Sequence, residues 1–265
     1  MRTALTIAGS DSGGGAGIQA DLKTFAAYGV YGVSAITAVT AQNTTGITAI
    51  APLSADLVTE QIETVVGDIR LHATKVGMLA TTAIVEVVAA AVESLGLPLV
   101  VVDPVMVSSS GERLLDADAI QALRNELFPL VRVVTPNIPE AEALSGRRIA
   151  SAADARDAAK RIRDMGPRAV IITGGHDRIP NPESRITDRL LDGDDWFEFA
   201  VERVESPPLH GTGCTFASAV AAGLALGRSL PDASREAQQF VAGAIRHATA
   251  VGRGRVPLNH FWRSA

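Results

Sequence analysis

Cysteine and aromatic residues are scarce in this sequence of 265 residues, and each shortage excludes a kind of site. Cys214 is the single cysteine, so neither an intramolecular disulfide nor a multi-cysteine metal site can form. Aromatic residues make up 4% of the chain, which is too few for a surface that stacks nucleic-acid bases. This composition favours a cytoplasmic protein built around aliphatic side chains.

Positive charge is also limited. The formal net charge is -5, lysine occurs only at Lys23, Lys75 and Lys160, and no cluster of Lys and Arg is present. A protein that binds the phosphate backbone of nucleic acids needs a basic face. Nucleic acid is therefore not an expected partner.

No apolar run reaches the roughly 18 residues that a membrane-spanning helix needs. The run from Ala4 to Ala8 is also too short for the core of a signal peptide and is predicted as a first strand. Hydrophobic residues make up 47% of the chain, and no linker, repeat or low-complexity segment interrupts it. We therefore expect a single domain over residues 1–265, with no membrane partner.

Short runs rich in Val and Ile alternate with stretches of helical apolar spacing. The runs predict buried parallel strands at residues 4–8, 33–40, 74–78, 99–103, 131–135 and 169–173. The helical stripes are Ile18/Leu22/Phe25, Val58/Ile62/Val65/Ile69 and Ile120/Leu123/Leu127. Later, residues 187–191 and 196–201 flank a turn and predict an antiparallel hairpin, followed by helices at about residues 213–228 and 232–251.

This alternation predicts the fold class α/β, with a doubly wound, mostly parallel sheet flanked by helices and an antiparallel hairpin at one edge. Ligands of such sheets bind beyond the carboxyl ends of the strands. The loops that follow the strands are therefore the expected place for a functional site.

The strongest local motif is His210-Gly211-Thr212-Gly213-Cys214-Thr215, which leads into an apolar helical stretch. A helix that begins here directs unpaired N–H groups and the positive end of its dipole at one spot, which suits a phosphate. Cys214 could then accept the proton of an attacking hydroxyl group, because a helix N-terminus lowers the pKa of a thiol. From the motif alone, Cys214 could equally be a small buried hydrophobic residue beside an ordinary capping turn.

A second glycine-rich loop covers residues 9–17, between the first strand and a helix that carries Asp21. It lacks the Lys-Ser/Thr ending of a Walker A loop and the spacing of a dinucleotide fingerprint. Its position favours a binding loop, while a flexible turn satisfied by its own Ser and Asp side chains remains open.

Polar residues follow two further predicted strands. Asp103, Asn137 and Glu140 could hold Mg²⁺ directly or through waters, since this ion prefers oxygen ligands. Asn137 and Glu140 are also suited to cap a helix, and the residues alone favour that interpretation. The polar segment 108–111, which follows Asp103, is a candidate flap.

The five histidines include no pair that is spaced as metal ligands. Most of them are expected to be structural or at the surface. His176 and His210 are exceptions because they lie in candidate loops, and His210 is close to Cys214 in the sequence.

Eight blocks of the sequence belong together when they are taken in order. They are AGSDSGGGAGIQAD (8–21), TAQNT (40–44), KVGML (75–79), DPVM (103–106), TPNIPEA (135–141), GGH (174–176), HGTGCT (210–215) and NHF (259–261). Each block is weakly specific, but their order over nearly the whole chain closely resembles that of hydroxymethylpyrimidine/phosphomethylpyrimidine kinases.

The resemblance implies a ribokinase-like fold, a homodimer and two successive phosphorylations by ATP with Mg²⁺. The acceptors would be 4-amino-5-hydroxymethyl-2-methylpyrimidine and then its monophosphate, in thiamine biosynthesis. A monovalent cation is a further candidate cofactor. The resemblance places the pyrimidine ring on Gln42, whose amide both donates and accepts as an aminopyrimidine edge requires.

The resemblance also assigns roles to the other candidate residues. The pyrimidine pocket would be lined by Gly9, Asp21, Met78 and Val105. The nucleotide would contact Asn137, Thr173 and Gly175, and the metal would be served by Asp103 and Glu140. The transferred phosphate would lie against Gly211, Thr212 and Gly213, with Cys214 as the base.

Some positions depart from the pattern of the family. Many relatives carry Lys where this chain has Ser109 and Thr173. The missing charges are expected to slow the reaction or to move charge neutralisation onto Mg²⁺ or an Arg such as Arg113. The stretch 177–185 is also unlike the usual loop, and no role is predicted for it.

Two other functions stay open from the sequence. Pyridoxal kinases have similar folds and phosphorylate a hydroxymethyl group on a related ring, and some relatives accept both substrates. The second is a non-catalytic binder of pyrimidine phosphates. The residues Ser109 and Thr173 favour the binder, whereas the intact motif around Cys214 favours a kinase.

Overall fold

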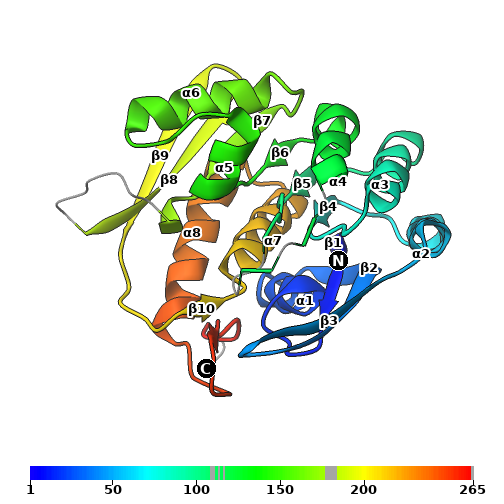
Figure 1. Ribbon diagram of the computed structural model, residues 1–265, viewed down its shortest axis with the longest axis horizontal. Coiled ribbons are helices and arrows are strands. Elements are labelled where there is room, and N and C mark those ends of the chain that lie inside the picture. Colours follow the sequence, from blue (N-terminus) through cyan, green and yellow to red (C-terminus); the bar gives the residue numbers. More distant parts are fainter. Residues whose placement is uncertain (108–110, 113, 116, 177–183, 264–265) are drawn as a thin grey trace.

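The computed structural model describes residues 1–107, 111–112, 114–115, 117–176 and 184–263 (Figure 1). Its main strands are β1 Thr3–Asp11, β2 Tyr31–Asn43, β3 Gly46–Pro52, β4 Ala73–Val76, β5 Val100–Val102, β6 Val133–Val134, β7 Ala169–Ile172, β8 Arg185–Asp192 and β9 Asp195–Glu202. They form one nine-stranded sheet in the order β3-β2-β1-β4-β5-β6-β7-β8-β9. A separate parallel pair joins β10 Leu209–His210 to β11 Val256–Pro257.

The strands from β2 to β7 in this order run parallel, whereas both edges of the sheet are antiparallel. At one edge β8 and β9 form the predicted hairpin. At the other edge β3 pairs antiparallel with β2, and this second antiparallel pair was not predicted. The predicted α/β class and the mostly parallel sheet are confirmed.

The helices cover both faces of the sheet (Figure 1). They are α1 Gly17–Ala27, α2 Ala55–Asp68, α3 Thr82–Ser94, α4 Ala117–Ala122, α5 Ile138–Ser145, α6 Ala152–Arg163, α7 Thr212–Ala225 and α8 Leu230–Arg246. Helices α2 to α6 pack on one face and α1, α7 and α8 on the other. The side chains of Ser54, Thr81, Ser151 and Ser229 each accept an N–H in the first turn of a helix, which fixes where α2, α3, α6 and α8 begin.

Two hydrophobic cores result, one on each face. Successive strand residues enter opposite cores: Leu5 and Val102 pack with α2 to α6, whereas Ala4 and Val101 pack with α1, α7 and α8. This alternation is the side-chain period of a strand. Because both faces are covered, the central strands β5, β6 and β7 are continuously apolar, which is why their sequence runs were recognisable.

Two helical predictions needed correction. The stripe at Ile120, Leu123 and Leu127 does not form one regular helix, because α4 continues as a π-helical turn at Leu123–Leu127 and a 3₁₀ turn at Phe128–Leu130. Helix α8 ends at Arg246, five positions before the predicted end at residue 251. No helix in the described part of the chain is long and apolar enough to span a membrane.

Candidate active site

A cavity of about 810 Å³ opens at the carboxyl ends of the parallel strands, where the fold predicts a ligand. The ends of β1 and β2 and the segments that follow β1, β4, β5, β6 and β7 line it, together with the start of α7 and one face of α8. All but one of the candidate residues lie on its wall: Gly9, Gln42, Met78, Asp103, Val105, Asn137, Glu140, Thr173, Gly175, Gly211, Thr212, Gly213 and Cys214. The exception is Asp21.

The N-terminus of α7 meets the glycine-rich loop at Gly211. This residue has a φ of 84°, and a methyl group added to it would lie 1.9 Å from the carbonyl oxygen of Gly15. Only glycine fits so close a backbone contact. Gly211 provides no side-chain cap for α7, so the first N–H groups of the helix face the cavity and are available to an anion.

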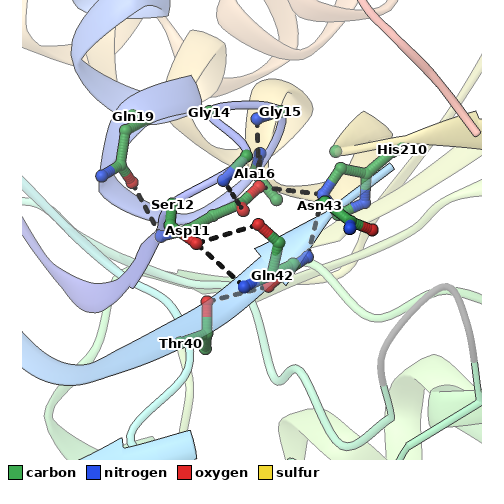
Figure 2. Close-up of polar contacts among 12 residues, drawn as sticks. Asp11, Ser12, Gly14, Gly15, Ala16, Gln19, Thr40, Gln42, Asn43 and His210 are labelled. Atoms are coloured by element: carbon green, nitrogen blue, oxygen red, sulfur yellow. Dashed lines mark hydrogen bonds and ion pairs between the residues drawn. The ribbon is translucent and has the colours of Figure 1, made fainter. Parts of the chain in front are cut away.

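The glycine-rich loop is organised around Asp11 (Figure 2). Its carboxylate accepts hydrogen bonds from the backbone N–H groups of Gly13, Gly15 and Ala16 at 2.8 to 3.0 Å. Burial would raise the pKa of Asp11, but the hydrogen bonds from His210, Ala16 and Gly13 outweigh it and lower the pKa. The loop is therefore satisfied by its own Asp, as the alternative interpretation held, and it also forms a cavity wall.

Gln42 lies at a register shift in the pairing of β2 with β3, where a bulge re-aims a side chain. Its backbone N–H donates to Oγ of Ser12 at 2.8 Å, and its carbonyl oxygen accepts from the same hydroxyl at 2.9 Å. Its carboxamide contacts His210 at 3.1 Å and Thr40 at 3.0 Å (Figure 2). Both the backbone and the side chain of Gln42 are thus held at the cavity.

Asp21 lies behind the cavity wall, so its prediction as a pocket residue was wrong. The side chains of Asp21 and Lys75 are both fully buried and form an ion pair of 2.9 Å. Asp21 also accepts hydrogen bonds of 2.6 Å from the hydroxyl groups of Thr6 and Ser218. It is Lys75, left without a role in the sequence analysis, that reaches the cavity.

Lys75 keeps its charge although it is buried. Burial by itself would lower the pKa of this ammonium group, but the attraction of Asp21, with smaller contributions from Cys214 and Asp103, raises the pKa above its ordinary value. A fixed positive charge therefore lies in the cavity wall close to Cys214 and Asp103.

Asn137 and Glu140 form a capping box at the start of α5, as the residues alone favoured. Oδ1 of Asn137 accepts the N–H of Glu140 at 3.0 Å, and Oε2 of Glu140 accepts the N–H of Asn137 at 2.9 Å. Both residues nevertheless line the cavity, so capping and ligand binding are compatible here. Thr173 lies beside them, because its N–H donates to the carbonyl oxygen of Pro136 at 3.0 Å.

The carboxyl groups of Asp103 and Glu140 are protonated more readily than in water. Burial raises the pKa of Asp103 to about 6. Burial and the nearby charge of Asp103 raise the pKa of Glu140 to about 8. Within the described ranges, no group of three or more His, Cys, Asp or Glu residues can hold a metal ion. Two buried oxygen donors still suit a cation that keeps waters, because such a cation would relieve their repulsion.

Cys214 lies on the cavity wall next to Asp103, whose pKa its thiol lowers slightly against the effect of burial. Burial raises the pKa of the thiol to about 12, although the Lys75 charge opposes this rise. The predicted lowering of the Cys214 pKa was therefore wrong, because desolvation outweighs the Lys75 charge and the backbone of Gly17, which both lower this pKa. The predicted position of Cys214, at the N-terminus of α7 and facing the cavity, agrees with the structure.

Apolar residues also line the cavity: Val241, Ala242 and Ile245 of α8, together with Val204 and Pro207. The sequence did not mark them for a role, since the pattern of α8 is that of any helix packed on a sheet. The predicted flap residue Ser109, Arg113 and residues 177–183 lie outside the described residues.

Comparison with known proteins identifies the family. A family model described as phosphomethylpyrimidine kinase matches residues 11–259. The chain belongs to this family. A hydroxymethylpyrimidine/phosphomethylpyrimidine kinase of Synechococcus elongatus is 47% identical to this kinase over 259 residues, covering 98% of the chain and 97% of the relative. The predicted family and enzyme class are confirmed.

Solved structures agree with this assignment. A Bacillus subtilis pyridoxal kinase in complex with ADP superposes on the kinase with a TM-score of 0.90 and 38% identity, covering 100% of this chain and 99% of that one. A phosphomethylpyrimidine kinase from Clostridium difficile superposes with a TM-score of 0.81 and 39% identity, covering 92% of this chain and 100% of that one. The predicted ribokinase-like fold is thereby confirmed.

Proposed function

We propose that this kinase transfers the terminal phosphoryl group of ATP to 4-amino-5-hydroxymethyl-2-methylpyrimidine and then to the resulting monophosphate. The observation that carries the proposal is that a single cavity joins Gln42 to the N-terminus of α7 and to Cys214. A site for a polar heteroaromatic ring and a site for a migrating phosphate are thus continuous. Relatives named for both phosphorylations, at about the same length, support the proposal.

Gln42 would recognise the pyrimidine. Its carboxamide can donate one hydrogen bond and accept another toward the ligand, which matches the adjacent amino group and ring nitrogen of the substrate. Gly9, Met78 and Val105 line the same part of the cavity. Bulk at Gly9 would collide with Met78, whose Cε would lie 2.6 Å from an added methyl group. Glycine at this position therefore leaves room for the flat ring.

The N–H groups at the start of α7 would stabilise the transferred phosphoryl group. Phosphoryl transfer depends mainly on positioning and on neutralising negative charge, and both are supplied here by a helix N-terminus and by the buried charge of Lys75. The attacking hydroxyl group would pass its proton to Sγ of Cys214. The thiol's own proton would pass to the neighbouring carboxylate of Asp103, which is mostly ionised at neutral pH because its pKa is about 6.

ATP would lie across the rest of the cavity, toward α8. Kinases with this fold have been solved with ADP and with AMP-PCP, and each of those complexes covers most of this chain. Asn137, Thr173 and Gly175 would contact the nucleotide. Asp103 and Glu140 would hold Mg²⁺ through waters, and the ion would supply charge neutralisation at the phosphates. We assign no residue to a monovalent cation.

The direct test is phosphorylation of the pyrimidine alcohol and of its monophosphate, assayed separately with Mg²⁺ and ATP. We expect turnover of both, and the Gln42→Ala variant should bind the pyrimidine about 10-fold or more weakly through loss of a buried polar partner. Gln121→Ala is the control, because Gln121 is exposed, donates to Asn125 and does not line this cavity. Unchanged affinity of Gln42→Ala would remove this residue from the pocket.

Pyridoxal phosphorylation is the second candidate function. The solved pyridoxal kinases of Bacillus subtilis and Staphylococcus aureus cover 98 to 100% of this chain at 36 to 38% identity. The pyrimidine kinases reach 47% identity, so we place the pyrimidine first. Turnover of both substrates under the same conditions decides between them, and a large preference for pyridoxal would reverse this order.

We further propose that residues 1–265 form one domain and that the kinase is a homodimer in the cytoplasm. One face of the β2–β3 pair supports the dimer, because its four neighbouring residues Val39, Ala41, Ala49 and Ala51 are apolar and exposed. A second copy would cover this face. Sedimentation of the Val39→Lys variant should show monomers if this face is the interface, and dimers if it is not.

A further inference from the structure

His210 lies where three segments that are distant in the sequence meet (Figure 2). Its Nε2 atom is 2.9 Å from Oδ2 of Asp11 and 3.1 Å from Nε2 of Gln42. Its ring also packs against the glycine-rich loop, since a methyl group added to Gly15 would lie 2.5 Å from Cδ2 of His210. The side chain is only 13% exposed, so these contacts hold the ring in place.

Nε2 of His210 cannot form hydrogen bonds with both the Asp11 carboxylate and the Gln42 amide nitrogen. The ionised carboxylate of Asp11 only accepts hydrogen bonds, so Nε2 of His210 has to carry a hydrogen. This holds for the neutral Nε2–H tautomer and for the imidazolium alike. The atom of Gln42 that faces this hydrogen must then be an acceptor, and an amide nitrogen is not one.

Thr40 leads to the same result by a separate route. Its Oγ1 lies 3.0 Å from the carbonyl oxygen of Ser10 and 3.0 Å from the other polar atom of the Gln42 carboxamide. A hydroxyl group has one hydrogen, and the Ser10 carbonyl group can only accept it. The atom of Gln42 that faces Thr40 is then the donor.

We infer that His210 is a positioning residue that fixes the orientation of the Gln42 carboxamide, with the oxygen toward His210 and the NH₂ group toward Thr40. The two ends of an amide are nearly equal in size, so this orientation requires no other movement of the side chain. It satisfies Asp11, His210, Gln42 and Thr40 together. The opposite orientation leaves two donors facing each other at His210.

The inference rests on the proposed function and extends it to substrate choice. In the fixed orientation, one lone pair of the Gln42 oxygen and one N–H remain for a ligand. They match the amino hydrogen and ring nitrogen of a 4-aminopyrimidine. A 4-oxopyrimidine bound in the same place presents a carbonyl oxygen and a ring N–H instead. Its carbonyl oxygen would face the Gln42 oxygen, so that two acceptors meet, and its ring N–H would face the Gln42 N–H, so that two donors meet. A carboxamide free to turn would accept either ring.

The test is the ratio of kcat/KM for the 4-amino substrate to that for its 4-oxo counterpart. We expect His210→Ala to lower this ratio about 10-fold or more. Without the His210 donor, the Thr40 hydroxyl group can turn from Ser10 and donate to Gln42, so the carboxamide can also take the opposite orientation. His210→Gln should keep the ratio within about 3-fold of the parent, since its NH₂ group can donate to both Asp11 and Gln42. His72→Ala is the control, as His72 contacts Thr3 at the opposite end of β1.

A His210→Ala enzyme with the ratio of the parent would overturn the inference. Failure of the unaltered kinase to phosphorylate the aminopyrimidine would instead count against the proposed function. A second measurement needs no variant: nitrogen NMR of histidine-labelled kinase should show a hydrogen on Nε2 of His210. A neutral ring with its hydrogen on Nδ1 would refute the inference even if His210→Ala does not fold.

Discussion

Cys214 should matter for the first phosphorylation far more than for the second. In the first reaction the nucleophile is an alcohol, whose proton has to leave as the new P–O bond forms. In the second reaction the nucleophile is a phosphate oxygen, and a phosphate monoester with a second pKa near 6 is already mostly ionised at neutral pH. A general base is thus needed only once in the proposed sequence.

The magnitude follows from the surroundings of the thiol. Removal of a general base typically slows a reaction about 10²- to 10⁴-fold. The pKa of Cys214 is raised to about 12, far from neutrality, which places this base at the weak end of the range. We therefore expect Cys214→Ala to slow the first phosphorylation about 10²-fold and the second less than about 3-fold.

Single-turnover kinetics with each acceptor separates the two steps from product release. Cys214→Ser is a useful companion variant, because it keeps a polar side chain of similar size beside Asp103 while removing the more acidic sulfur. Affinity for both acceptors should be nearly unchanged in either variant. Equal slowing of both steps would show that Cys214 shapes the cavity and does not accept a proton, and unchanged rates would remove it from the chemistry.

Other predictions address the wall of the cavity. Lys75→Met leaves a buried aspartate unpaired and should destabilise the fold by about 3–5 kcal/mol in urea unfolding; a loss below about 1 kcal/mol would contradict the fully buried ion pair. Gly211→Ala should lower Tm much more than Gly227→Ala does. Both glycines have a φ of 84°, but of the two only Gly211 lies against another backbone segment. Equal shifts in Tm would show that this backbone contact does not require glycine. The pKa of Glu140 is raised from 4.5 to about 8, so the folded state holds a proton that the unfolded state loses. Stability of the ligand-free kinase should therefore fall as pH rises from about 4.5 to about 8. Glu140→Gln should flatten this dependence and the exposed Glu60→Gln should not, and identical pH curves would refute the assignment.

The parallel strands could be predicted because their signal is local. Runs such as residues 100–102 and 169–172 are apolar throughout, as is typical of strands covered on both faces. β3 was missed for the opposite reason. It lies at an edge, most of its residues are exposed, and it ends in Pro52, so neither a buried run nor a polar alternation marks it.

The candidate site was predictable where a residue's position along its strand determines its role. Asp103, Asn137 and Thr173 follow strands whose carboxyl ends meet at the cavity, so sequence order placed them together. The sequence could not predict that Lys75, and not its ion-pair partner Asp21, lines the cavity. Which of two paired charges faces the cavity depends on the side-chain directions of α1 and β4, and spacing does not encode this.

The pKa of Cys214 could not be predicted from the sequence either. Its place at a helix N-terminus is visible in the sequence, but burial dominates its pKa, and the charges of Asp103 and Asp21 from other segments raise this pKa further. The contact of His210 with Asp11 spans 199 positions, and its contact with Gln42 spans 168. Such contacts become visible only when the fold brings β10 to the glycine-rich loop.

A crystal structure with the pyrimidine alcohol and an unreactive ATP analogue tests the central claim most directly. We predict that the ring will contact Gln42, and that its hydroxymethyl oxygen will lie about 3–3.5 Å from the terminal phosphorus, held by the first N–H groups of α7. A ring bound away from Gln42, or a terminal phosphate remote from residues 211–214, would contradict the account.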